Sequence, residues 1–177
     1  MGESRKIKYH MKIRTKVTFK EYVKLLYGLA YQRPIMKFLL GIALLILFWI
    51  TFYYLNVITL PEPIIYQYIT LALIIVAQPI VIFTTIRTVY YSSNHICQTL
   101  EMDILPKEIK VHGESFYMEV KWKKMFKIVE KPKWFLIYQN SLSAIIIPKK
   151  DLQANEISHV RKILQELKNV KVELLST

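Results

Sequence analysis

Two long apolar runs dominate the hydrophobic pattern of the chain. The first covers residues 38–60 and the second residues 64–86, and neither contains an Asp, Glu, Lys or Arg. A helix of about 20 apolar residues crosses the hydrocarbon core of a bilayer, so each run is long enough to span it. A Pro-Glu-Pro turn at residues 61–63 separates the runs, and proline favours the end of one helix and the start of the next. The pattern predicts a transmembrane hairpin within residues 36–91.

Before the hairpin, residues 1–35 show two further patterns. Residues 6–17 alternate Lys, Arg or His with apolar or β-favouring residues, which predicts a half-buried strand with one basic face. Thr18 and Glu21 have the spacing of a capping box and predict a helix over residues 19–32. This amphipathic helix suits either the membrane surface or a position on the soluble domain, and the strand could join the sheet predicted after the hairpin.

After the hairpin, a helix is expected to continue to about residue 100, and period-two alternation then predicts strands joined by short turns. A final amphipathic helix over residues 155–167, capped by Asn155 or Asp151, would close the sheet. The tail from residue 168 could add a short strand. The predicted strands are residues 99–105, 108–112, 116–122, 125–130, 133–139 and 142–147.

The fold class expected from these elements is an α+β membrane protein. Its hairpin anchor carries a small cytoplasmic domain, residues 92–177, in which a bent antiparallel sheet forms a roll closed by the C-terminal helix. This shape best fits a pleckstrin-homology-like (PH-like) domain.

Charge sets the expected orientation of the hairpin. The chain has a net charge of +12, and residues 1–37 alone carry ten Lys and Arg against two Glu. The positive-inside rule therefore predicts that both termini are cytoplasmic. Because anionic lipid beside the spans accounts for the basic flanks, no nucleic-acid partner is expected. The residues expected to anchor the hairpin at the interfaces are Arg33, Lys37, Tyr53, Tyr54, Tyr66, Arg87, Tyr90 and Tyr91.

Motifs for catalysis or metal binding are scarce. Cys97 is the only cysteine, so there is no intramolecular disulfide and no cysteine cluster, and a single free thiol fits a reducing compartment. The four histidines lack the spacing of metal ligands, and four glycines provide no phosphate-binding loop. Glu101 and Asp103 share a strand face, where we expect them to pair with lysines at the surface. We therefore predict a protein that is not an enzyme and has no cofactor and no metal.

Lysines surround two of the tryptophans and form a basic, aromatic region. It could bind anionic lipid, a nucleic-acid strand or a protein partner. Alternatively, the tryptophans could be core residues or interfacial anchors beside a solvated lysine face. The candidate surface comprises Lys121, Lys123, Lys124, Lys131, Lys133 and Trp134.

Several short motifs resemble those of the YcxB-like membrane proteins. Trp122 near a strand end is followed by KIVEKPKWFLIY and then by AIIIPKKDL, so the signature positions here are Trp122, Pro148 and Lys149. In architecture the resemblance covers nearly the whole chain. It implies a PH-like cytoplasmic domain on a hairpin anchor in the bacterial inner membrane, and it implies no particular activity.

Three functions fit these features. The first is an inner-membrane-anchored interaction module that presents its basic domain to a protein partner, as a regulator, an assembly factor or an immunity protein against a toxin. The second is a module that binds anionic lipid through its basic faces. The third is an oligomeric transporter or pore subunit, which the absence of ionisable residues in the spans disfavours. We adopt the first as the working hypothesis.

Overall fold

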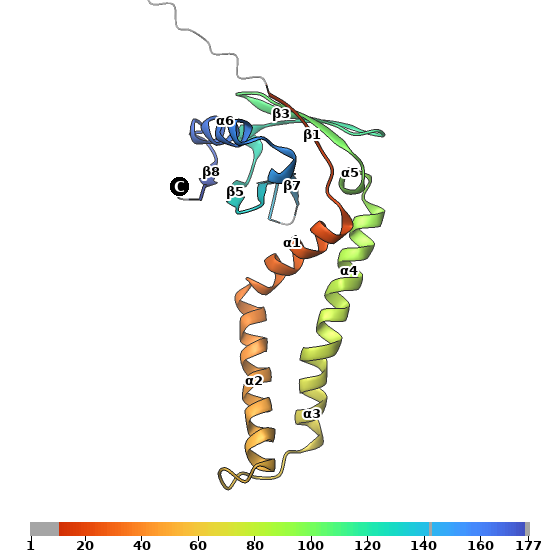
Figure 1. The fold of residues 1–177 in the computed structure, drawn as a ribbon, viewed down its shortest axis with the longest axis vertical. Helices are drawn as coiled ribbons and strands as arrows, with labels where there is room; N and C mark the ends of the chain where they lie inside the picture. Colours follow the sequence, from red (N-terminus) through yellow and green to blue (C-terminus); the bar gives the residue numbers. More distant parts are fainter. Residues whose placement is uncertain (1–10, 142, 176–177) are drawn as a thin grey trace, which may run out of the picture. The chain divides into compact units, whose positions relative to one another are not determined.

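The computed structural model describes residues 11–141 and 143–175, apart from the side chains of Asn94 and His95. The chain divides into two compact units (Figure 1). Residues 18–92 form a helical unit, and the chain on either side of it forms a β unit. The strand and the helix predicted within residues 1–35 therefore belong to different units.

The helical unit contains two helices that are long and apolar enough to cross a membrane. They are Pro34–Tyr54, with a mean hydropathy of 2.4 over its most apolar window, and Ile65–Ser92, with 2.3. The second is continuous in Figure 1 but includes a π-helical turn just before Pro79, whose missing N–H and ring disturb the regular helical bonding. The elements are α1 (Phe19–Tyr31), α2 (Pro34–Tyr54), α3 (Ile65–Ala72), η1 (Leu73–Ala77) and α4 (Gln78–Ser92).

The bounds of both predicted spans shift. The first helix begins at Pro34 and ends at Tyr54, six residues before the predicted end, because Asn56 adopts a left-handed backbone conformation (φ 49°) that cannot continue a helix. The second continues to Ser92, and a four-residue helix, α5 (Asn94–Cys97), follows.

The predicted capping box at the start of α1 is confirmed. The Thr18 N–H donates to Glu21 Oε2 (3.0 Å), and the Glu21 N–H donates to Thr18 Oγ1 (3.4 Å). The helix packs on α4, where the Phe19 and Tyr22 rings contact the Tyr90 ring. These contacts place α1 in the helical unit.

Within the described residues, the strands of the β unit form two four-stranded sheets, with the orders β1-β2-β3-β4 and β7-β6-β5-β8. The prediction of one bent sheet was wrong, because the chain forms a 3₁₀ turn, η2 (Trp122–Lys124), between β4 and β5, and the two strands do not pair. The strands are β1 (Met11–Thr15), β2 (Leu100–Ile104), β3 (Glu108–His112), β4 (Tyr117–Lys121), β5 (Lys127–Lys131), β6 (Trp134–Tyr138), β7 (Ala144–Pro148) and β8 (Lys171–Glu173).

The N-terminal strand joins the strands that follow the hairpin. β1 pairs antiparallel with β2, with Ile13 opposite Met102, so one sheet contains chain segments from both sides of the helical unit. The tail also adds a strand, because β8 pairs parallel with β5. Residues 6–10 and 142 of the predicted strands lie outside the described residues.

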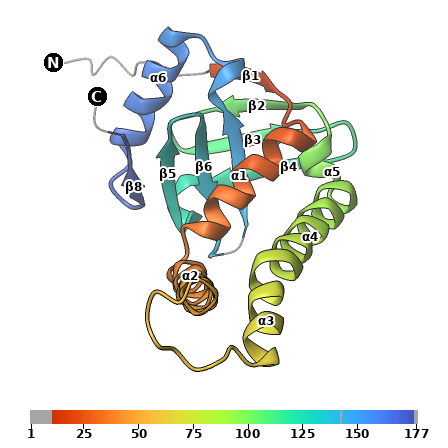
Figure 2. The same cartoon turned by 60° about the horizontal axis from the view of Figure 1, so that its bottom comes forward.

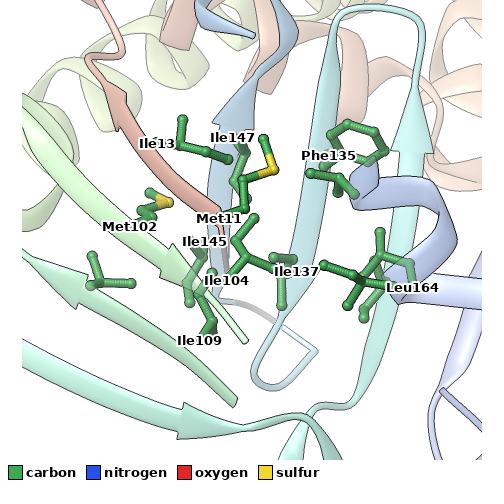
Figure 3. Packing of buried hydrophobic residues seen from close by; sticks show 14 of the residues in the cluster. Met11, Ile13, Met102, Ile104, Ile109, Phe135, Ile137, Ile145, Ile147 and Leu164 are labelled. Carbon is green, nitrogen blue, oxygen red and sulfur yellow. The ribbon is translucent and has the colours of Figure 1, made fainter. Parts of the chain in front are cut away.

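The core of the β unit lies where the two sheets meet α6 (Ala154–Gln165), as Figures 2 and 3 show. Met102 and Ile109 come from the first sheet, Phe135 and Ile147 from the second, and Leu164 from α6; each is at most 1% exposed. Burial of these side chains away from water is the main stabilising contribution to the unit.

The predicted cap of α6 was wrong. The N-cap residue is Gln153, whose backbone N–H donates to Glu156 Oε2 (2.7 Å). Asp151 instead bonds to β1, where Thr15 Oγ1 and the Lys16 N–H donate to its Oδ2 (2.7 and 3.2 Å). Asp151 belongs to a 3₁₀ turn, η3 (Lys149–Asp151), that separates β7 from α6 and brings its carboxylate to β1.

Candidate functional site

The structure divides the predicted basic surface into two groups. Lys121, Lys123 and Lys124 are exposed at the turn that precedes β5. Lys131, Lys133 and Trp134 lie at the turn that follows β5, where Lys133 is exposed and the other two are half-buried. The length of β5 therefore separates the two groups.

A groove of about 720 Å³ lies beside the first group, entirely within the β unit. Three segments line it. They are the turn between β2 and β3, with Lys107; the end of β4 and the start of η2, with Trp122; and the loop from Glu166 to Val170 that follows α6. Its volume falls in the usual range of ligand sites, about 300–1,000 Å³.

Trp122 holds two of these segments together. Its indole Nε1 donates to the backbone oxygen of Leu105 (2.7 Å), and its backbone N–H donates to the oxygen of Lys107 (3.1 Å). The side chain is only 2% exposed, and a buried indole N–H needs such a partner. Trp122 thus fixes the turn between β2 and β3 and forms part of the apolar floor of the groove.

Four exposed lysines line the groove, namely Lys107, Lys121, Lys123 and Lys168. In the described part of the chain, none of them has an ion-pair partner. Of the two glutamates in the lining, Glu108 is paired with Lys110 (3.4 Å). The groove therefore has an excess of positive charge and favours an anionic occupant.

A different set of charges surrounds Glu130, whose side chain has no exposed surface. Its Oε1 accepts from Lys149 Nζ and from Arg161 Nε (2.9 Å), and its Oε2 accepts from the Leu175 N–H (3.1 Å). Burial raises the pKa of the Glu130 carboxyl, but the hydrogen bonds from Arg161, Lys149 and Leu175 outweigh burial and lower it overall. The network stabilises a carboxylate where an apolar residue would usually lie.

Residues 104–164 match the family model described as YcxB-like protein. The resemblance seen in the sequence is confirmed for this segment. Comparisons with curated proteins and with solved structures found no match. The YcxB-like segment runs from the end of β2 to α6 and contains two of the three segments that line the groove, whereas the loop that follows α6 lies beyond it.

The three residues predicted to be family-signature positions have structural contacts. Trp122 fixes a turn, and Pro148 ends β7, opposite Trp134 of β6. Lys149 is paired with Glu130, and its Nζ lies 4.8 Å from the centroid of the Phe135 ring. Sequence reasoning missed Glu130 and Arg161, because nothing in the pattern of KIVEK marks its glutamate as buried.

Glu101 and Asp103 pair with basic side chains on the outer face of the first sheet. Lys12 Nζ lies 2.8 Å from Glu101, and His112 Nε2 lies 3.5 Å from Asp103. These pairs compensate part of the basic face predicted for the N-terminal strand. Within the described residues, no three His, Cys, Asp or Glu side chains are close enough together to hold a metal ion.

The predicted interfacial residues lie near the ends of the long helices, with one correction. Tyr90 is only 6% exposed, because its ring packs on those of Phe19 and Tyr22, so it is a packing residue of the helical unit. The others are Arg33 and Lys37 at the start of α2, Tyr53 and Tyr54 at its end, Tyr66 at the start of α3, and Arg87 and Tyr91 in the last turns of α4.

Proposed function

We propose that the protein is a non-enzymatic binding module anchored in the bacterial inner membrane. α2 and the continuous helix from α3 to α4 span the membrane with both termini in the cytoplasm, and the β unit is a PH-like domain that binds a protein partner. The observation that carries this proposal is the groove with four unpaired lysines in a unit joined to two apolar helices.

The surface of the helical unit supports the membrane anchor. Large apolar side chains are exposed along both long helices, for example Phe38 (65%), Leu45 (70%) and Ile65 (65%). Such a surface is unfavourable in water and favourable against lipid chains. The basic flanks of the helices support the cytoplasmic orientation of the termini.

A protein partner fits the β unit better than a lipid surface does. The groove combines its lysines with apolar side chains of Trp122, Leu167 and Val170 and with the carboxylate of Glu166. A phosphate headgroup would gain nothing from the apolar floor, whereas apolar side chains of a protein partner would cover it. Binding of anionic lipid remains the second candidate function, because unpaired lysines next to a membrane attract acidic headgroups.

The buried carboxylate supports a non-enzymatic role. Glu130 is the only charged residue among the buried residues of the described chain, and both of its oxygens are occupied by hydrogen bonds from neighbouring groups. A general acid or base must reach a substrate proton, and this carboxylate is enclosed by its own network.

The anchor and the partner are tested separately. With Cys97 replaced by Ser, single cysteines at Glu62 and Ser158 are labelled in intact cells with a membrane-impermeant maleimide. We expect label at Glu62→Cys in intact cells and at Ser158→Cys only after permeabilisation, and the reverse pattern would contradict the orientation.

The partner is sought by crosslinking the tagged protein in membranes of its native host, followed by purification and mass spectrometry. One stoichiometric protein is the expected result. Enrichment of anionic lipid without any protein would overturn the protein-binding function in favour of the lipid alternative.

A further inference from the structure

We infer that the lysine-lined groove of the β unit binds an acidic, extended peptide segment of a protein partner. This inference rests on the proposed function and names the site and the chemistry of its ligand. It combines three features of the groove: uncompensated charge, an apolar floor and a position at the edge of a sheet.

The charge of the groove identifies an anionic ligand. Lys107, Lys121, Lys123 and Lys168 come from three separate segments, so tertiary structure brings together like charges that repel one another. Glu166 offsets one of these charges, and Glu108 is already paired with Lys110. A ligand with several carboxylates would compensate the remaining positive charge.

The charge also excludes a second copy of this chain as the natural occupant. The chain has a net charge of +12, and residues 1–10 carry three Lys or Arg against one Glu. Two copies would bring basic surfaces together, which costs free energy and slows association. The occupant is therefore a different, acidic molecule.

The floor and the edge of the groove favour a peptide over a compact anion. Leu167 and Val170 are half-buried and offer apolar surface that hydrophobic side chains of a peptide would cover. β4 ends at Lys121 in the groove, and among the described strands none pairs with its outer edge. Exposed sheet edges accept extended peptides through backbone hydrogen bonds, while side-chain pockets add specificity.

The test uses the full chain in nanodiscs of neutral phosphatidylcholine. The probe is a fluorescein-labelled peptide of alternating Glu and Val, with a Lys-Val peptide as the counter-probe. The groove variant is Lys121→Glu/Lys168→Glu, and the matched control is Lys20→Glu/Lys162→Glu. The control changes the net charge equally at two exposed lysines outside the groove lining.

We expect the wild type to bind the Glu-Val peptide and not the Lys-Val peptide. The groove variant should bind the Glu-Val peptide at least about tenfold more weakly, because two charge pairs become repulsive. The control should stay within about twofold of the wild type, as expected of exposed charges that do not line the groove. Equal melting temperatures of the two variants would show that both are folded.

Three results would overturn the inference. The first is that the wild type does not bind the Glu-Val peptide. The second is that both variants lose the same affinity for it. The third is that the protein floats with phosphatidylglycerol vesicles in a way that depends on Lys121 and Lys168, without binding the peptide. Failure of this inference can be distinguished from failure of the proposed protein-binding function. A protein partner that crosslinks equally to the wild type and to the groove variant would leave the proposed function intact and remove this site.

Discussion

Lys149 forms an ion pair with Glu130, although the two side chains are only 10% and 0% exposed. Arg161 of α6 binds the same carboxylate oxygen, and the N–H of Leu175 binds the other. One carboxylate of β5 therefore holds the turn after β7, the last helix and the C-terminal tail. Lys149, the lysine predicted to be a signature position, thus makes a tertiary contact.

Removing the charge of Glu130 should destabilise the β unit. Glu130→Gln leaves Lys149 and Arg161 partly buried without their anion, which we expect to lower the free energy of unfolding by about 3 kcal/mol. The measurement is denaturant unfolding of the full chain in detergent, followed by the fluorescence of its tryptophans. Glu173→Gln is the matched control, because Glu173 is exposed and, among the described residues, its ion-pair partner is the exposed Lys171. This change should cost less than about 1 kcal/mol. Equal losses would contradict a structural role for the network.

The same carboxylate predicts how stability depends on pH. The pKa of Glu130 in the folded state lies below its ordinary value of 4.5, because the hydrogen bonds outweigh the effect of burial. Its contribution is therefore fully present above the unfolded-state pKa and is lost as the pH falls through the folded-state pKa. The melting temperature of the wild type should fall more steeply than that of Glu130→Gln below about pH 4.5. Parallel curves measured from neutral to acidic pH would contradict this linkage.

Trp122 should stabilise the β unit through its indole hydrogen bond as well as through the size of its ring. Trp122→Phe keeps an aromatic ring but leaves the Leu105 oxygen without the indole donor, which should cost about 1–3 kcal/mol of stability. Trp134→Phe is the control, because Trp134 is half-buried and its indole has no hydrogen bond within the described chain. Unfolding measurements should show the larger loss at Trp122. The opposite order would contradict its role in fixing the turn beside the groove.

The hydrogen bond between Thr15 and Asp151 should contribute to stability by linking β1 to η3, the turn that follows β7 of the second sheet. Thr15→Val and Asp151→Ala each remove the bond from Thr15 Oγ1 to Asp151 Oδ2, so their effects should not add. We expect a coupling energy of about 1 kcal/mol in a double-mutant cycle of unfolding free energies. Strictly additive losses would show that the bond contributes nothing to stability.

Much of the local structure could be predicted from the sequence. The two long helices depend on uninterrupted apolar residues, which is a property of consecutive positions. The strand at residues 108–112 and the capping box of Thr18 and Glu21 likewise depend on short spacings. The cap of α6 was harder, because Asn155, Gln153 and Asp151 are all polar and only the path of the chain decides which of them faces the first turn.

Tertiary structure alone decided how the strands pair and where the groove forms. β1 pairs with β2 although the whole helical unit lies between them in the sequence. Lys107, Lys121 and Lys168 come from three separate segments and line one groove. Glu130 can be buried because Lys149 and Arg161 donate hydrogen bonds to its carboxylate. The hydrophobic pattern of its own strand gives no sign of these two partners. The sequence by itself determined the elements, through the local pattern of apolar and polar residues. Their pairing, the buried charge and the groove depend on contacts between remote residues, which local patterns do not specify.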